Sequence, residues 1–164
     1  MSWYAWSSAI ARGVAAVPDE ALLRAAEFLY TSDLVLVAGN GGSSALASHA
    51  AQALGKPGYA AGGGRAAICL TDNVPLLTAH ANDGGWETAL LEVARPYLTC
   101  RPRGAVGVQF VLLLISSSGR SRNVVRLAEH ARGRACPVIA LTGFGCEPLR
   151  SLATVSLHVD SEDY

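Results

Sequence analysis

The sequence has little charge, and its charges form no stripe of one sign. Charged residues make up 16% of the 164 positions, and 13 basic residues balance 13 acidic ones, so the formal net charge is zero. Without a run of lysine or arginine to neutralise the phosphates of a polymer, nucleic-acid binding is disfavoured. Apolar residues make up 51%. This balance suits a protein that buries part of its surface in an oligomer, although scattered exposed apolar residues are also normal in monomers.

Long apolar runs and paired cysteines are also missing. The longest apolar run, Phe110 to Ile115, is too short to span a bilayer. The first residues lack the basic segment and clean apolar run of a signal peptide. The four cysteines include no CxxC pair and do not have the spacing of a zinc module. We therefore expect a cytoplasmic protein with reduced thiols and with neither a membrane nor a nucleic acid as partner.

The sequence does contain an alternation of short apolar runs and helical segments. The apolar runs are continuous, as in the strands of a parallel sheet that is covered on both faces. They lie at 34–38, 66–70, 110–115, 138–141 and 153–157, and helices are expected at 3–14, 19–30, 43–54, 74–81, 86–93 and 123–131. Residues 55–64 and 99–107 are expected to be loops. The pattern predicts one α/β domain over residues 1–164, a three-layer sandwich around a five-stranded parallel sheet.

The expected helix within residues 1–17 begins with three aromatic residues, Trp3, Tyr4 and Trp6. These side chains could pack on a partner subunit, which would place the helix at an oligomer interface. They could equally cover the core of their own chain, and the sequence leaves both possibilities open.

A serine-rich segment, Ile115 to Ser121, joins the third apolar run to the helix that follows it. Ligands of open α/β sheets bind at the carboxyl ends of strands, where a helix N-terminus offers free N–H groups and a positive potential. Gly119 permits a tight turn, and the hydroxyls of Ser116, Ser117, Ser118 and Ser121 can donate to phosphate oxygens. The segment therefore predicts a phosphate cradle, with an ordinary turn capped by Ser121 as the alternative.

A glycine-rich segment follows the first apolar run, and an acidic turn lies further along the chain. Gly39 to Ser43 lets the backbone approach a ligand, and Asn40 and Ser43 can bind hydroxyls or phosphate. It has neither the spacing of a dinucleotide fingerprint nor a P-loop lysine, and a plain tight turn is the alternative. Asp72 and Asp83 could hold sugar hydroxyls, although helix capping is the favoured explanation for both when they are taken alone.

Taken in order, four segments resemble the SIS (sugar isomerase) domain family, with the phosphoheptose isomerases as the closest subfamily. They are 39–43, Asn82-Asp83, 115–121 and 138–143, and the resemblance covers about residues 19–160. It implies a flavodoxin-like sandwich, a homotetramer with sites between subunits, and a phosphorylated sugar, a heptose 7-phosphate, as partner. It also implies that Ser116, Ser117, Ser118 and Ser121 hold phosphate, and that Asn40, Gly41, Ser43 and Asp83 contact the substrate. His49 matches a zinc-binding histidine of the family, so zinc is the one cofactor implied.

The sequence departs from the family where catalysis needs side chains. Isomerisation of a ketose to an aldose requires a base and an acid. The family has a glutamate one helical turn after the histidine, whereas this chain has Ala53, which can neither bind metal nor take a proton. The family also continues into a C-terminal helix with a glutamine and a histidine that the sequence, which ends at Tyr164, does not include. Glu87 and His49 are the remaining catalytic candidates, and His49 alone is too few ligands for zinc.

Two functions follow from the resemblance and these departures. The first is isomerisation of sedoheptulose 7-phosphate by a phosphoheptose isomerase-like protein. The second is a catalytically inactive phosphosugar sensor or protein-binding tetramer, which would keep the phosphate cradle and lose the acid–base residues.

Overall fold

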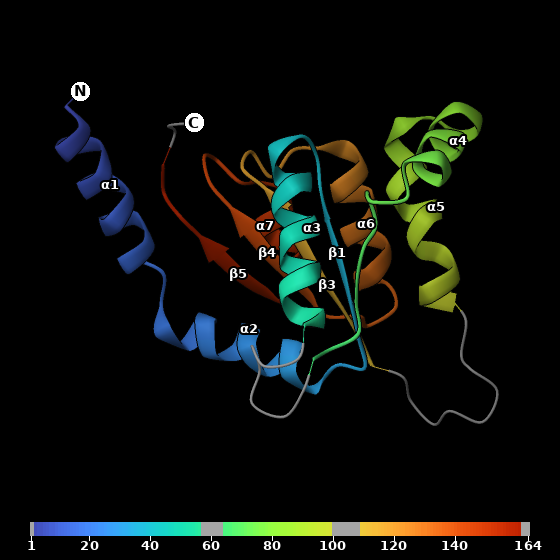
Figure 1. Ribbon diagram of the computed structural model, residues 1–164, viewed down its shortest axis with the longest axis horizontal. Helices are drawn as coiled ribbons and strands as arrows, with labels where there is room; N and C mark the ends of the chain where they lie inside the picture. The colour runs from blue at the N-terminus through green and yellow to red at the C-terminus, as the bar shows by residue number, and fades with distance from the viewer. Residues whose placement is uncertain (1, 57–63, 100–108, 162–164) are drawn as a thin grey trace.

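The computed structural model describes residues 2–56, 64–99 and 109–161, which form one parallel sheet with helices on both faces (Figure 1). The strands are β1 (Leu34–Gly39), β2 (Ala67–Cys69), β3 (Phe110–Ser116), β4 (Val138–Thr142) and β5 (Val155–His158). Their order across the sheet is β2-β1-β3-β4-β5, and every neighbouring pair is parallel. This is the flavodoxin-like order, which confirms the predicted fold class.

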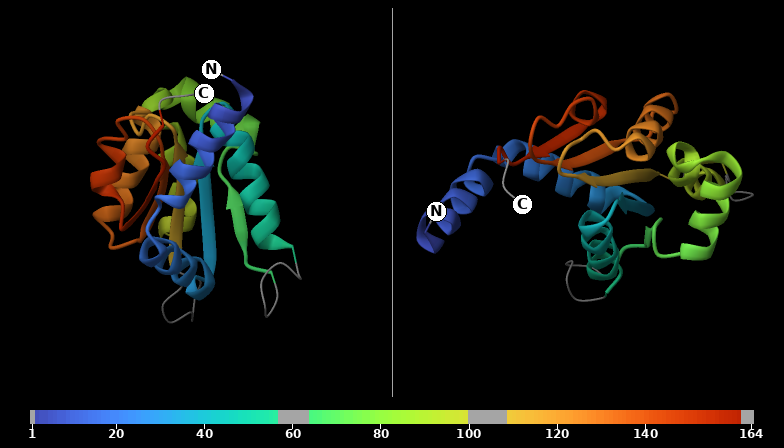
Figure 2. Two further views of the ribbon diagram at one scale, coloured as in Figure 1. Left: turned by 90° about the vertical axis from the view of Figure 1, so that its left-hand side faces the viewer. Right: turned by 90° about the horizontal axis from the view of Figure 1, so that it is seen from above.

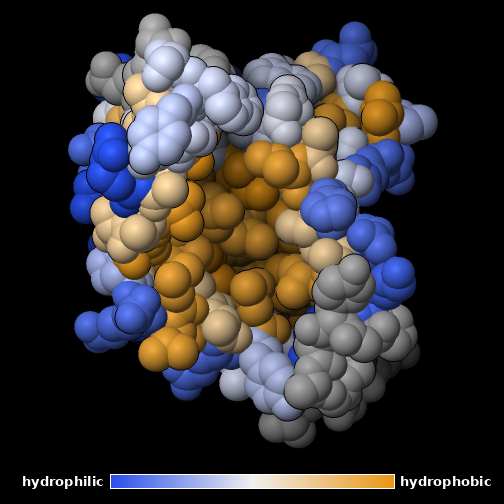
Figure 3. All heavy atoms as spheres, turned by 60° about the vertical axis from the view of Figure 1, so that its left-hand side comes forward, coloured by the Kyte–Doolittle hydropathy of each residue, from blue (hydrophilic) through white to orange (hydrophobic). Residues whose placement is uncertain are grey.

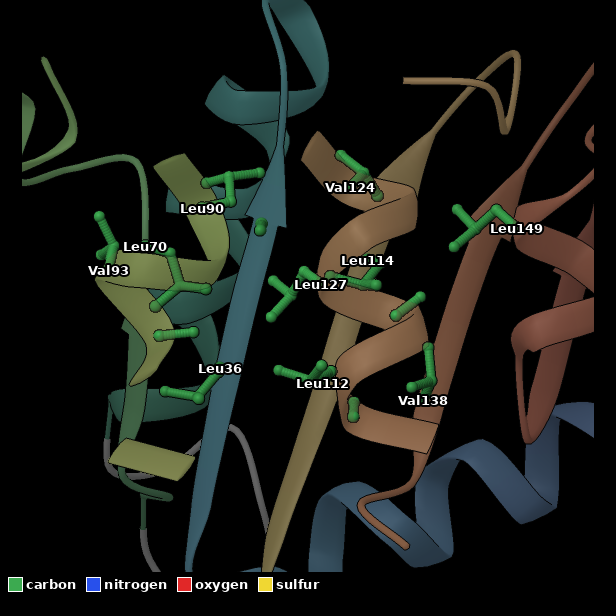
Figure 4. Close-up of a cluster of buried hydrophobic side chains, with 14 of the residues drawn as sticks. Leu36, Leu70, Leu90, Val93, Leu112, Leu114, Val124, Leu127, Val138 and Leu149 are labelled. Carbon is green, nitrogen blue, oxygen red and sulfur yellow. The ribbon is translucent and has the colours of Figure 1, made fainter. Parts of the chain in front are cut away.

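The continuous apolar strands feed two separate cores, because successive residues of a strand point to opposite faces. Leu36 and Ala38 of β1 pack on the face covered by α4 (Val74–Gly84), α5 (Trp86–Thr99), α6 (Arg122–Arg132) and α7 (Leu149–Leu152). Figure 4 shows Leu36 in this core with side chains from α5, α6 and α7. Val35 and Val37 pack on the opposite face against α2 (Asp19–Thr31) and α3 (Gly42–Gly55). The result is the expected three-layer sandwich.

Most of the expected elements lie within a few residues of those observed, with three differences. The last strand begins at Val155 rather than at 153, because α7 occupies residues 149–152. Only Gly85 separates α4 from α5. The helix α5 continues past Pro96 to Thr99, beyond its expected end at 93. Of the expected loops, residues 57–63 and 100–107 lie outside the described part of the chain.

The first helix, α1 (Trp3–Ala15), stands away from the sheet and its covering helices (Figure 2). None of its residues is buried, and Trp3 and Tyr4 are 77% and 79% exposed. The helix meets the rest of the chain near Gly13, where an added Cβ would lie 2.8 Å from a methyl carbon of Val159. The helix therefore does not cover the core of its own chain, and its packing on a partner stays a prediction.

Over the described residues, no helix has the length and apolar character that crossing a bilayer requires.

Candidate functional site

The two loops that the sequence singled out lie side by side at the carboxyl edge of the sheet. β1 and β3 are neighbours, and Gly39 lies opposite Ile115 near their ends. The chain leaves β1 for α3 and β3 for α6, and these two helices cover opposite faces of the sheet. The space between β1 and β3 is therefore a topological switch point, where open α/β sheets bind their ligands.

The serine loop, residues 116–121, is held in shape by its own hydrogen bonds. The N–H of Gly119 donates to the Oγ of Ser116 over 3.2 Å, and the N–H of Arg120 donates to the Oγ of Ser118 over 3.3 Å. Ser121 is the N-cap residue of α6 by position, but its side chain makes no capping hydrogen bond. A hydroxyl that accepts one hydrogen bond keeps its own proton, so Ser116 and Ser118 can still donate to a ligand.

The glycine loop, residues 39–43, turns tightly from β1 into α3. Gly39 lies so close to the first turn of α3 that an added Cβ would be 2.6 Å from the carbonyl oxygen of Ser43. The N–H of Ser43 donates to the carbonyl of Asn40 over 3.0 Å, which closes the turn. The first turn of α3 thus begins directly at the strand end, where its N-terminal dipole can act on a bound anion.

A reciprocal pair of amide hydrogen bonds joins the glycine loop to the first turn of α6, directly after the serine loop. The Nδ2 of Asn40 donates to the Oδ1 of Asn123 over 2.8 Å, and the Nδ2 of Asn123 donates to the Oδ1 of Asn40 over 3.0 Å. Asn123, in the first turn of α6, is completely buried. The sequence analysis did not single out this residue. A buried asparagine needs a hydrogen-bond partner, but the sequence does not show that Asn123 is buried, so it gave no signal for this residue.

A pocket of about 530 Å³ opens between the two loops. It is lined by Asn40, Gly41, Gly42, Ser43, Leu46, Ile115, Ser116, Ser117, Ser118 and Ser121. The pocket thus brings together every predicted substrate-binding residue except Asp83. None of these lining residues is charged, so an anion here would be held by hydroxyls, backbone N–H groups and the N-termini of α3 and α6.

The other predicted residues lie outside this lining. Asp83, in the last turn of α4, is exposed and accepts a hydrogen bond from the Nδ2 of Asn82 over 3.1 Å. Glu87, in the first turn of α5, forms an ion pair with Arg122 of α6. This contact raises the pKa of the Arg122 guanidinium and joins α5 to the helix that follows the serine loop. His49 is exposed on α3, one helical turn before Ala53.

The side chains do not gather into a metal site within the described ranges. No three histidine, cysteine, aspartate or glutamate residues lie close enough there to hold an ion. His49 would offer zinc a single nitrogen, whereas zinc takes three or four protein ligands. These residues therefore do not fit the zinc site that the family resemblance implies.

The fold and the pocket define a doubly wound α/β protein with a polar, uncharged pocket at its switch point. More particularly, the chain belongs to the SIS domain family, whose sequence model matches residues 2–143. It is 33% identical to the phosphoheptose isomerase of Helicobacter pylori over 138 residues, which is 84% of this chain and 67% of that protein.

Solved structures agree with the sequence comparison. The phosphoheptose isomerase of Neisseria gonorrhoeae matches with a TM-score of 0.81 and 29% identity, over 98% of this chain and 84% of that one. The corresponding structure from Francisella tularensis gives a TM-score of 0.76 and 26% identity, over 95% and 81% of the two chains. The resemblance seen in the sequence is thereby confirmed, and the chain is a sugar-phosphate isomerase-like protein.

Proposed function

We propose that the chain binds a heptose 7-phosphate, such as sedoheptulose 7-phosphate, in the pocket between the serine and glycine loops. The observation that carries this proposal is the convergence of four serines with two helix N-termini in a pocket whose lining has no charged side chain. A phosphate dianion needs hydrogen-bond donors and the absence of nearby carboxylates. The residues of this lining offer donors and include no carboxylate. The relatives named phosphoheptose isomerase support a heptose as the sugar.

The two loops would divide the ligand between them. The hydroxyls of the serine loop and the N-terminus of α6 would hold the phosphate, and Asn40 and Ser43 would bind sugar hydroxyls from the glycine loop. Asp83 is not among the lining residues, so a contact from its carboxylate would need a ligand that extends beyond the pocket.

Isomerisation moves a proton between adjacent carbons, and the pocket lining does not supply the groups for this step. Asparagine, glycine, serine, leucine and isoleucine make up the whole lining, and none is a suitable general base. Glu87 is paired with Arg122, and Ala53 replaces the glutamate of the family. These observations favour the second candidate function, binding without turnover by a sensor or a protein-binding subunit.

Calorimetry tests both functions when the chain is titrated with sedoheptulose 7-phosphate in two samples, one containing zinc and one containing a chelator. NMR then examines each sample for aldose product. Binding with product supports the isomerase, with Glu87 or His49 as the next residues to substitute. Binding without product supports the second function. Absence of binding in both samples would overturn the proposed ligand. Product that forms only with zinc would support the zinc site despite the poor donor set.

The double variant Ser118→Ala/Ser121→Ala tests the phosphate cradle. We expect it to weaken binding of sedoheptulose 7-phosphate at least tenfold, because hydrogen bonds to charged groups contribute about 1.5–3 kcal/mol each. Folding stability should fall by no more than about 1 kcal/mol, since Ser118→Ala removes one exposed hydrogen bond, from the N–H of Arg120, and Ser121 makes no capping hydrogen bond.

Asn73→Ala is the matched control for this variant. Asn73 does cap its helix, because its Oδ1 accepts from the N–H of Leu76 over 3.2 Å. Its replacement should therefore lower the free energy of unfolding by about 1 kcal/mol and leave binding unchanged. Unaltered affinity in the double serine variant would show that the cradle is misassigned.

The same proposal includes a homotetramer in the cytoplasm. The exposed apolar side chains of α1, Trp3, Tyr4 and Val14, support an assembly, since an isolated helix gains nothing from exposing them. The low content of charged residues, 16%, is also consistent with an assembly.

A further inference from the structure

The amide pair between Asn40 and Asn123 lies at the edge of the pocket, because Asn40 is one of the lining residues. The partners are 83 residues apart in sequence, and their side chains bridge the end of β1 and the start of α6. The pair spans the switch point itself, where the two chain connections separate to opposite faces of the sheet. No other side-chain hydrogen bond between the glycine loop and the first turn of α6 is present among the described residues.

The orientation of both amides is fixed by a backbone group. The N–H of Val124 donates to the Oδ1 of Asn123 over 3.0 Å, and a backbone N–H can donate only to the oxygen of an amide. This bond fixes the positions of the Oδ1 and Nδ2 of Asn123. The Nδ2 of Asn40 must then face the Oδ1 of Asn123, and the Oδ1 of Asn40 must face the Nδ2 of Asn123. The Asn40 amide is therefore held in one of its two possible orientations.

Only one partner of the pair reaches the ligand pocket. Asn40 is among the lining residues, whereas Asn123 is fully buried and is not. After pairing, the Nδ2 of Asn40 keeps one hydrogen and its Oδ1 keeps one acceptor site. Asn123 thus leaves Asn40 with one donor and one acceptor in a fixed direction.

We propose that Asn123 is a positioning residue, which orients the Asn40 amide toward the sugar and holds the glycine loop at a fixed distance from the serine loop. This inference rests on the proposed binding of a sugar phosphate in the pocket. On that proposal a sugar phosphate uses the Asn40 amide as well as the phosphate donors, whereas inorganic phosphate uses only the serine hydroxyls and the helix N-termini, so the two ligands should respond differently when the pair is broken. A preorganised contact is also worth more than a mobile one, since the ligand does not have to order it.

The test is a double-mutant cycle with Asn123→Ala, Asn40→Ala and the double variant. Affinities for sedoheptulose 7-phosphate and inorganic phosphate are measured by calorimetry. We expect Asn123→Ala to weaken sugar-phosphate binding about tenfold, which corresponds to about 1.4 kcal/mol, and phosphate binding less than twofold. In the Asn40→Ala background, Asn123→Ala should change sugar-phosphate affinity less than twofold, because the amide it orients is already gone.

Each alternative outcome has a distinct meaning. An unchanged sugar-phosphate affinity in Asn123→Ala, an equal loss for both ligands, or a full tenfold loss in the Asn40→Ala background would overturn the positioning role and leave the proposed function intact. If the wild-type chain binds sedoheptulose 7-phosphate in neither experiment, the proposed function fails, and this inference fails with it. Asn123→Leu, which keeps most of the buried volume, replaces Asn123→Ala if the alanine variant does not fold. Asn73→Ala serves as the control for loss of an asparagine outside the pocket.

Discussion

At the scale of single residues, Gly119 shows how the serine loop depends on a close backbone approach. Its φ of +63° lies in the left-handed region, and an added Cβ would lie 2.0 Å from the carbonyl oxygen of Cys146. The N–H of Leu149 donates to the carbonyl of Gly119 over 3.2 Å, which joins the loop to α7. The loop is thus packed directly on the segment that follows β4.

We expect Gly119→Ala to lower the free energy of unfolding by about 2–4 kcal/mol, because backbone strain and a clash with backbone atoms act together. Gly41→Ala is a matched control, since Gly41 also has a positive φ, of +53°, but an added Cβ would meet nothing within 4 Å. That variant should lose only about 1 kcal/mol. Urea unfolding measures both, and equal losses would mean that contact with the Cys146 backbone does not matter.

Residue-scale reasoning from the sequence located most of the pocket and missed its internal connection. Gly39 to Ser43 and the serines could be predicted because each group follows an apolar run, and parallel strands end at one edge of a sheet. The Asn40–Asn123 pair could not, because its partners meet only through the order of the strands. The ion pair of Glu87 with Arg122 was missed for the same reason. It makes Glu87 a weaker candidate for the catalytic base, because its carboxylate is already paired.

At the scale of elements, the contact between α5 and α6 contains a histidine in an unfavourable environment for charge. The Nε2 of His130 is buried and has no hydrogen-bond partner among the described residues. Burial lowers the pKa of His130, and the positive charges of Arg134 and Arg95 lower it further, while Glu92 acts in the opposite direction. The imidazole is therefore harder to protonate in the folded chain than in the unfolded one.

This difference predicts a loss of stability in mild acid. Below the unfolded pKa of about 6.5 the unfolded state binds the proton more readily, so the free energy of unfolding falls as the pH drops through and below this value. We expect His130→Gln to reduce this dependence between pH 7.5 and pH 5. Urea unfolding at several pH values measures the slopes, and identical slopes for the variant and the wild type would contradict the assignment.

The hydrophobic pattern of the sequence identified the long helices and strands but not the short helix α7. The apolar runs at 34–38 and 110–115 are too continuous for a half-exposed strand, so they indicated the central strands β1 and β3 correctly. The four-residue helix α7 contains barely one turn and leaves no periodic pattern to detect. The order of the strands came from the family resemblance, because periodicity does not state which strands are neighbours.

At the scale of the whole molecule, the face between α1 and α3 is apolar and hollowed (Figure 3). A hollow of about 300 Å³ there is lined in part by Ile10, Leu46, Leu141 and Val159, and it shares Ser43 and Ser117 with the ligand pocket. Leu46 is 60% exposed beside it. An apolar face of this kind is typical of interfaces, and the sites between subunits that the family resemblance implies stay a prediction.

The proposed tetramer leads to a test on α1. Trp3, Ile10 and Val14 recur at helical spacing and therefore lie on one side of α1. Val14 is 58% exposed, so a monomer would tolerate a carboxylate there. In an interface the same carboxylate would be buried, which costs free energy. We expect the wild-type chain to sediment with the mass of four 17.0 kDa chains and Val14→Glu to shift it to smaller species. Arg12→Glu is the control, because two residues along a helix point about 200° apart and it places the same group on the other side of α1. A wild-type chain that sediments as a monomer, or a Val14→Glu variant that sediments like the wild type, would show that α1 does not hold an assembly together.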